Sequence, residues 1–171
     1  IPRHPAALPP DWGACRMIAI AAIALVILMA SPFQHPKDRY KDRNPVVIVH
    51  ATEQEARSAA LADAAKLKGN HYRTSGTGSM EPLLTGRVYV VGVAKPYDQL
   101  QQGEIANYRA KFADGGIVLH RLVQKDKGGW IGSGDNNRWS ESNERIKPSN
   151  YIDTVVRVHT YKGAEKTRVK K

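Results

Sequence analysis

A chain of 171 residues can bury the core of one domain, but two full domains would be cramped in it. Its formal net charge of +10 predicts an anionic partner, either nucleic acid or a lipid surface. The sequence contains no zinc-ligand pattern, no Gly-rich phosphate loop and no aromatic RNA-binding motif, so no nucleic-acid partner is expected. The single cysteine, Cys15, excludes an intramolecular disulfide.

The first 45 residues differ in composition from the rest of the chain. Residues 1–16 include four prolines and are predicted to be an irregular leader. Residues 17–33 begin with the unbroken apolar run MIAIAAIALVILMA, which predicts a single membrane anchor once its flanking residues are counted. A cleavable signal peptide is the main alternative because the run is short and follows Arg16, and a buried helix is the third. Residues 34–45 are polar and charged and are predicted to be a linker.

A strand and a helix are predicted directly after the linker. Residues 46–50 are a short run of valine and isoleucine, which is typical of a strand. Residues 52–68 are predicted to form a short amphipathic helix with a mostly alanine face. Thr52 can cap this helix, Glu55 completes a capping box, and Gly69 follows where the helix would end.

The rest of the chain has the character of a β domain. Short runs rich in valine, isoleucine and tyrosine alternate with clusters of Gly, Asp and Asn. They predict strands near 87–94, 104–109, 116–123, 129–133 and 153–161. Residues 46–161 are therefore expected to form one mainly β domain. Residues 162–171 are a basic tail, interpreted as a solvated end or as a contact with anionic headgroups.

Residues 74–82, with the sequence TSGTGSMEP, can present a reactive serine. Gly76 and Gly78 allow a sharp turn and the close approach of another chain, and Pro82 stiffens the exit. Ser79, held on such a turn, can direct its hydroxyl outward, with backbone N–H groups nearby to receive an oxyanion. Taken alone, a cluster of serine and glycine is more often a plain loop.

A serine nucleophile needs a base, and His120 is the strongest candidate among six histidines. It lies inside the otherwise apolar run 116–123. Asp135 follows the next predicted strand, in the turn GSGDNN, and can return beside His120. An acid that accepts the second N–H of a histidine fixes its tautomer. Each feature also has a structural interpretation, since a lone histidine in a strand is usually structural and Gly-Asp-Asn-Asn favours a turn.

Taken in chain order, these blocks resemble the type I signal peptidases. The blocks are Ser-Met-x-Pro, a Gly-acid strand start at Gly103-Glu104, His120-Arg121 within an apolar strand, and Gly-Asp-Asn. They run from about residue 74 to residue 158, roughly half the chain. The bacterial members carry lysine where this chain has His120, and histidine is similar to the archaeal and endoplasmic-reticulum branch. Glu104 departs from the usual aspartate.

The resemblance implies a role for each residue of the site. Ser79 would attack the scissile carbonyl, while His120 would act as general base and then as general acid. Asp135 would orient His120, with Glu141 as the alternative acid. The oxyanion hole would consist of the Thr77 hydroxyl and the Ser79 backbone N–H. A shallow apolar pocket for small residues before the cleaved bond would be formed by Met80, Leu84 and Leu119.

The resemblance also implies a setting for the enzyme. The fold would be a signal-peptidase or LexA-like β domain behind a membrane-anchor helix. A preprotein substrate would lie extended against strand edges near 73–77 and 116–120. The protein would cross the membrane once, contact lipid, hold its catalytic domain outside the cytoplasm (on the periplasmic side if bacterial), and need neither cofactor nor metal.

Two alternatives remain from the sequence. An inactive or repurposed version of the fold, serving as a structural or interaction module, would explain the positive charge and the mismatch at Glu104. A repressor-type autopeptidase shares the fold and a Ser-Met signature. That family uses a lysine base and a DNA-binding helical module, whereas this chain has His120 and an apolar run.

Overall fold

The structure is a computed structural model that describes residues 40–137, 144–167 and 169. The predicted leader (1–16) and membrane anchor (17–33) lie outside the described residues, as does Glu141. Among the residues that are described, no helix is both long enough and apolar enough to cross a membrane.

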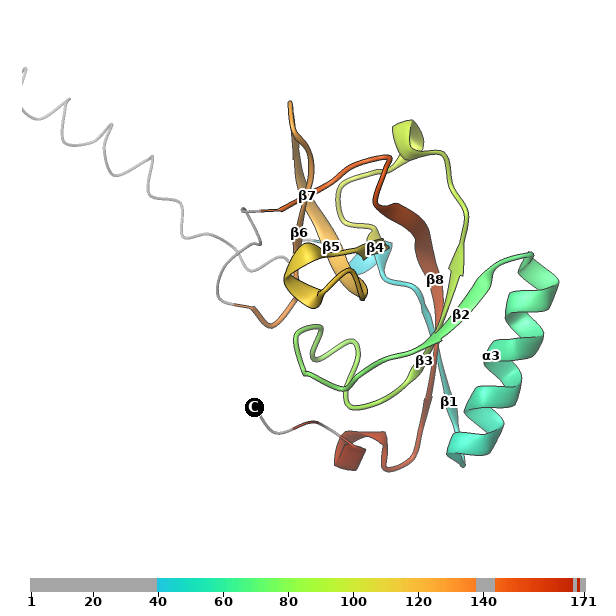
Figure 1. Cartoon of the computed structure of the whole chain (residues 1–171). Coiled ribbons are helices and arrows are strands. Elements are labelled where there is room, and N and C mark those ends of the chain that lie inside the picture. Colours follow the sequence, from blue (N-terminus) through green and yellow to red (C-terminus); the bar gives the residue numbers. More distant parts are fainter. Residues whose placement is uncertain (1–39, 138–143, 168, 170–171) are drawn as a thin grey trace, which may run out of the picture. The chain divides into compact units, whose positions relative to one another are not determined.

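One sheet of eight strands dominates the described part of the chain (Figure 1). The strands are β1 (Val46–His50), β2 (Asn70–Arg73), β3 (Tyr89–Val93), β4 (Ile105–Arg109), β5 (Ile117–Asp126), β6 (Gly129–Ser133), β7 (Arg145–Ile146) and β8 (Tyr151–Tyr161). Their order is β2-β3-β8-β4-β5-β6-β7, and β1 pairs with β8. The β1–β8 pair is parallel and the other pairs are antiparallel. The prediction of a mainly β domain is confirmed.

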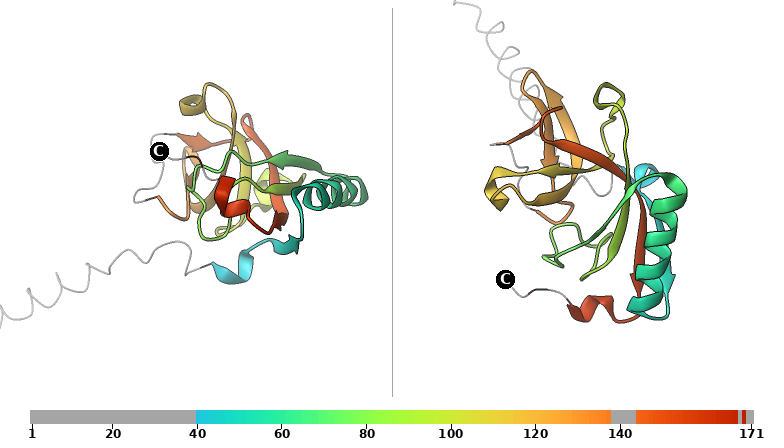
Figure 2. Two further views of the ribbon diagram at one scale, coloured as in Figure 1. Left: turned by 90° about the horizontal axis from the view of Figure 1, so that it is seen from below. Right: turned by 45° about the vertical axis from the view of Figure 1, so that its right-hand side comes forward.

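The helical elements are one α-helix and several short 3-10 turns in the described residues. The α-helix is α3 (Glu53–Leu67), and Figure 2 shows it (teal) along one side of the sheet. The 3-10 turns are η1 (Lys41–Arg43), η2 (Tyr97–Gln99), η3 (Lys111–Ala113) and η4 (Ala164–Thr167). One core cluster joins α3 to β3 and β8, and it includes the buried face of α3: Ala56, Ala60 and Ala64. A second cluster lies around β4 and β6.

Residues next to α3 in the sequence determine where this helix begins and ends. The Thr52 side chain accepts the Glu55 backbone N–H at 3.2 Å, and Glu55 Oε2 accepts the Ala51 N–H at 3.0 Å, so the predicted capping interactions form. At the other end Lys68, with φ of 54°, takes the left-handed conformation. Gly69 is required for a different reason, because a Cβ there would lie 2.2 Å from the carbonyl oxygen of Gly92.

The predicted strands are all present, and two further strands were not predicted. Each of the five ranges from 87 onward overlaps an observed strand, and so does 46–50. β2 has the sequence NHYR, which lacks the apolar alternation that indicates a strand. It forms because the end of α3 places it beside β3, to which it pairs from Asn70 to Arg73. β7 has two residues, too few to leave a pattern.

Two histidines, His159 (buried) and His50 (half-buried), lie between β1, β8 and α3. His50 Nε2 and His159 Nδ1 are 3.0 Å apart, and the rings stack with centroids 5.3 Å apart. His159 Nε2 lies 3.2 Å from Asp63 Oδ2, which also accepts a hydrogen bond from Arg157 at 2.5 Å. Burial lowers the pKa of His159, and the Asp63 carboxylate opposes that shift without reversing it. His159 is therefore held in its neutral form as the pH falls.

This lowered pKa predicts a loss of stability on mild acidification. The unfolded chain binds a proton on His159 near its ordinary pKa of 6.5, whereas the folded chain resists that proton. The stability that neutral His159 supplies is complete above about pH 6.5 and is lost as the pH falls towards the lower folded pKa. Urea denaturation from pH 7 to pH 5 should show this fall, and His159→Asn should flatten it. His71→Asn, at an exposed histidine, is the control; an unchanged slope in His159→Asn would refute the assignment.

Candidate active site

Ser79 lies on the segment between β2 and β3. The segment begins at Thr74, whose N–H donates to the Val88 carbonyl at 2.8 Å and whose hydroxyl accepts the Val88 N–H at 2.9 Å. It then turns at Gly76 and Gly78, which have φ of +73° and +80°, a conformation that favours glycine. The Ser79 side chain is left half-buried. The glycines predicted to make the turn do so.

The Ser79 segment packs against the core cluster around α3 and against the basic tail. The buried side chains of Met80 and Leu84 join the core cluster around α3. The basic tail also packs here, since the Val169 N–H donates to the Gly76 carbonyl at 2.9 Å. Thr167 Oγ1 accepts the Arg87 N–H at 2.7 Å. Thr167 and Val169 of the tail are therefore part of the fold rather than a solvated end.

The Gly-Asp-Asn turn after β6 is hydrogen-bonded to the backbone carbonyls of Gly78 and Ser79. Asn136 donates its backbone N–H to the Ser79 carbonyl at 2.8 Å and its side-chain amide to the Gly78 carbonyl at 3.1 Å. A Cβ on Gly134 would lie 2.6 Å from the Ser79 carbonyl oxygen, so only glycine allows this approach. Asn136 was not predicted to have a role, although it follows Asp135 directly in the sequence.

Asp135 binds Arg121, and this corrects the predicted contact with His120. Arg121 Nε donates to Asp135 Oδ1 at 2.7 Å and Nη2 donates to Oδ2 at 2.6 Å, with both residues 1% exposed. Arg121 also donates to the Gly103 carbonyl at 2.7 Å and to Asn44 Oδ1 at 2.8 Å, at the end of the predicted linker. His120 and Arg121 are neighbours in β5, so their side chains point to opposite faces of the sheet. Asp135 is bonded to Arg121 and therefore lies on the face opposite His120.

The His120 ring contacts a tyrosine of the neighbouring strand. His120 is 3% exposed, and its Nδ1 lies 3.2 Å from the hydroxyl of Tyr108 on β4. The β4–β5 register pairs Ala106 with His120, which brings Tyr108 diagonally to the ring. Gly132 on β6 leaves room for this contact, because a Cβ at that position would lie 3.3 Å from the Tyr108 hydroxyl. Tyr108 was not recognised in the sequence.

A groove of about 700 Å³ brings the predicted residues together. One wall consists of residues 72–80 and the other of residues 117–120, close to the strand edges expected to bind a substrate. Ser79 and His120 both line it, and Thr77 Oγ1 lies 3.4 Å from Ser79 Oγ. The residues predicted for an apolar pocket line it too: Met80, Leu84 and Leu119.

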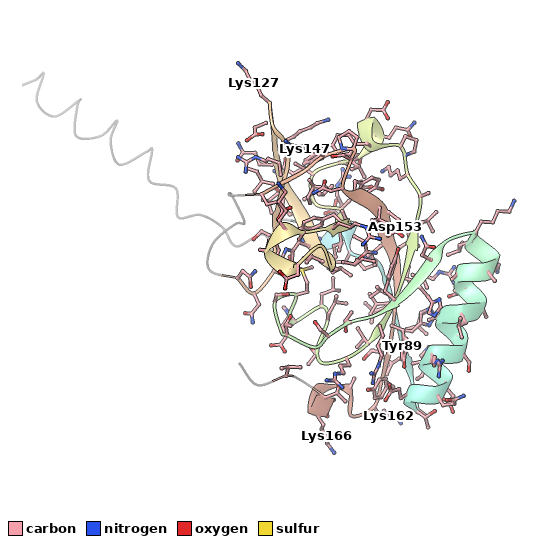
Figure 3. All side chains as sticks on the ribbon, in the orientation of Figure 1. Tyr89, Lys127, Lys147, Asp153, Lys162 and Lys166 are labelled. Atoms are coloured by element: carbon pink, nitrogen blue, oxygen red, sulfur yellow. The ribbon has the colours of Figure 1, made fainter. Side chains whose placement is uncertain are left out.

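Part of the groove lining is polar and is anchored on Asp153, a fully buried residue of β8 (labelled in Figure 3). The hydroxyl of Tyr72 donates to Asp153 Oδ2 at 2.6 Å, and the amide of Asn107 donates to Oδ1 at 2.7 Å. Both donors line the groove. Burial, together with the Asp153 carboxylate, raises the pKa of Tyr72, so this hydroxyl remains a hydrogen-bond donor. The network was not predicted, because it needs residues from three strands.

The described residues contain no cluster of three or more His, Cys, Asp or Glu side chains that could hold a metal ion. The groove lining includes one serine on a glycine turn, Ser79, and one histidine, His120. No protein-family model and no curated protein matches this chain.

Proposed function

We propose that this chain is a serine endopeptidase of the signal-peptidase kind, which cleaves signal peptides or a dedicated exported preprotein after small residues. The observation that carries the proposal is that Ser79 and His120, distant in sequence, line one groove. The resemblance in motif order and the serine on a glycine turn support it further. The signal-peptidase or LexA-like fold, the anchor at 17–33 and a catalytic domain outside the cytoplasm belong to the same proposal.

In this mechanism the peptide lies extended in the groove and the Ser79 oxygen attacks its scissile carbonyl carbon. His120 takes the Ser79 proton as the new C–O bond forms. The negative charge on the carbonyl oxygen is stabilised by the Thr77 hydroxyl and the Ser79 N–H. The C–N bond then breaks and His120 gives its proton to the leaving amine. A water molecule, deprotonated by His120, releases the acyl group and restores Ser79.

The surrounding residues set geometry and substrate size in this proposal. Met80, Leu84 and Leu119 leave an apolar wall that suits a small side chain before the cleaved bond. Asp135 acts at a distance, because its bond to Arg121 ties the middle of β5 to the turn that holds the Ser79 segment.

Incubating the full chain, in neutral detergent, with a model preprotein tests the proposal. We expect a shortened product whose new N-terminus follows a small residue, and no such product with Ser79→Ala. Absence of product with the wild-type chain, or equal product with Ser79→Ala, would argue against a serine endopeptidase.

Tyr108→Phe should slow catalysis without weakening substrate binding. Tyr108 is a positioning residue, since its hydroxyl contacts His120 Nδ1 rather than the substrate. Loss of one such hydrogen bond is worth about 1 kcal/mol, which corresponds to a fall in kcat of roughly 5- to 10-fold. We expect KM to stay within about twofold and the pH dependence of kcat to change. Tyr151→Phe, which removes a hydroxyl 2.9 Å from Thr154 Oγ1, is the matched control; equal effects in both variants would show that Tyr108 is only structural.

A further inference from the structure

A second cavity, of about 870 Å³, lies beside the catalytic groove. It is formed by the end of β4, by η3 and by the residues around β7. Four of its lining side chains are cationic: Arg109, Lys111, Arg145 and Lys147. Its described lining contains one carboxylate, that of Glu144.

Two acids near this cavity, Glu144 and Asp126, are already bonded within the fold. Both oxygens of Glu144 accept the Lys111 backbone N–H at 3.0 Å. Arg145 donates to Asp126 Oδ2 at 2.7 and 2.9 Å, outside the cavity lining. The side chains of Arg109, Lys111 and Lys147 are exposed. The described lining therefore keeps an excess of positive charge, which raises the local concentration of anionic groups.

The cavity continues the route of an extended peptide through the groove. Phe112 lines both spaces and is 57% exposed. From His120 the groove follows β5 back to Ile117, a distance of about 10 Å at roughly 3.3 Å per residue. Phe112 and the second cavity lie beyond that point. A peptide whose scissile bond lies at Ser79 thus reaches the cavity at least about four residues from that bond.

We propose that this cavity is a subsite for an acidic side chain of the peptide substrate, four to eight residues from the scissile bond. The proposal rests on the proposed peptidase function and adds a charge preference to the apolar pocket. An exposed ion pair contributes up to about 1 kcal/mol, so the preference amounts to roughly fivefold in affinity. Salt screens exposed charges, so the preference decreases as ionic strength rises.

Binding of fluorescent peptides to the full-length Ser79→Ala chain in neutral detergent tests this subsite without requiring cleavage. Each peptide carries one Glu, placed four to eight residues before or after the small residue at the cleavage position, and has a matched peptide with Gln. We expect Glu peptides to bind about fivefold tighter on one side of the bond at low salt, and equally at high salt.

Charge reversal locates the effect. Lys147→Glu and Lys111→Glu should each remove the Glu preference, whereas Lys162→Glu, the same change at a distant exposed lysine, should leave it intact. Figure 3 shows Lys147 and Lys162 at opposite ends of the domain. The Lys162 variant controls for net charge, because all three substitutions change it equally.

Three outcomes would overturn the subsite. They are equal or absent binding of Glu and Gln peptides, a preference that survives Lys147→Glu and Lys111→Glu, and a preference lost equally in Lys162→Glu. If those two cavity variants lose binding to anionic vesicles but keep the peptide preference, the cavity binds lipid headgroups instead. A wild-type chain that cleaves nothing, combined with a cavity-dependent Glu preference, would contradict the peptidase and leave the subsite standing.

Discussion

Ser79→Ala is expected to lower kcat/KM for a cleaved preprotein by at least about 10³-fold, because the proposed mechanism forms its acyl intermediate on the Ser79 oxygen. His120→Gln, which keeps a side chain of similar size in a buried position, should cause a loss of the same order. The melting temperature of Ser79→Ala should be unchanged, since the segment is held by Met80, Leu84 and Asn136 rather than by the serine hydroxyl. Initial rates and thermal unfolding of the same preparations measure both effects.

A graded change at Thr77 separates catalysis from folding in this experiment. Thr77 is exposed, and its hydroxyl lies 3.4 Å from Ser79 Oγ. Thr77→Val removes one oxyanion donor and should lower kcat by about 10²-fold, whereas Thr77→Ser keeps the hydroxyl and most of the activity. Full activity in Thr77→Val would remove Thr77 from the oxyanion hole, and a Ser79→Ala variant within 10-fold of wild type would remove Ser79 from the mechanism.

Asp135→Ala is expected to reduce the free energy of unfolding by about 3–5 kcal/mol, because it leaves the guanidinium of Arg121 buried without its carboxylate partner. Both groups are almost fully buried and are joined by two hydrogen bonds. Replacing both together, as Arg121→Met with Asp135→Leu, should recover much of that loss, since apolar side chains of similar volume leave no buried charge. Urea denaturation measures all three forms.

A further variant, Asp135→Asn, decides what Asp135 does. If Asp135 only pairs with Arg121, Asp135→Asn should destabilise the fold, and kcat should fall only in proportion to the folded fraction. If Asp135 instead oriented His120 directly, as the sequence first predicted, Asp135→Asn would lower kcat by about 10⁴-fold with little change in stability. The second result would refute the assignment made from the hydrogen bonds.

The parts of the fold and site that could be predicted are those determined by residues close together in the sequence. The cap at Thr52, the turns at Gly76 and Gly78 and the apolar strand around His120 depend on neighbouring residues alone. Ser79 and His120 also lie in one groove, as the ordered motifs suggested.

The rest of the site depends on strand pairing, which local patterns do not encode. Tyr108 reaches His120 through the β4–β5 register and the missing side chain at Gly132. The Asp153 network draws on β2, β4 and β8, and β2 itself has no apolar alternation. The partner of Asp135 is an exception. Adjacent residues of a strand point to opposite faces, so the sequence alone could have predicted that one acid does not contact both His120 and Arg121.

Labelling with a fluorophosphonate probe tests the central claim most directly, because it reports an activated serine without any assumption about substrate. The full chain should be labelled covalently, with the modification mapped by mass spectrometry to Ser79. Ser79→Ala should not be labelled, and His120→Gln should be labelled far more slowly than wild type. A wild-type chain that resists the probe, or that is modified at a different serine, would contradict a Ser79 nucleophile activated by His120.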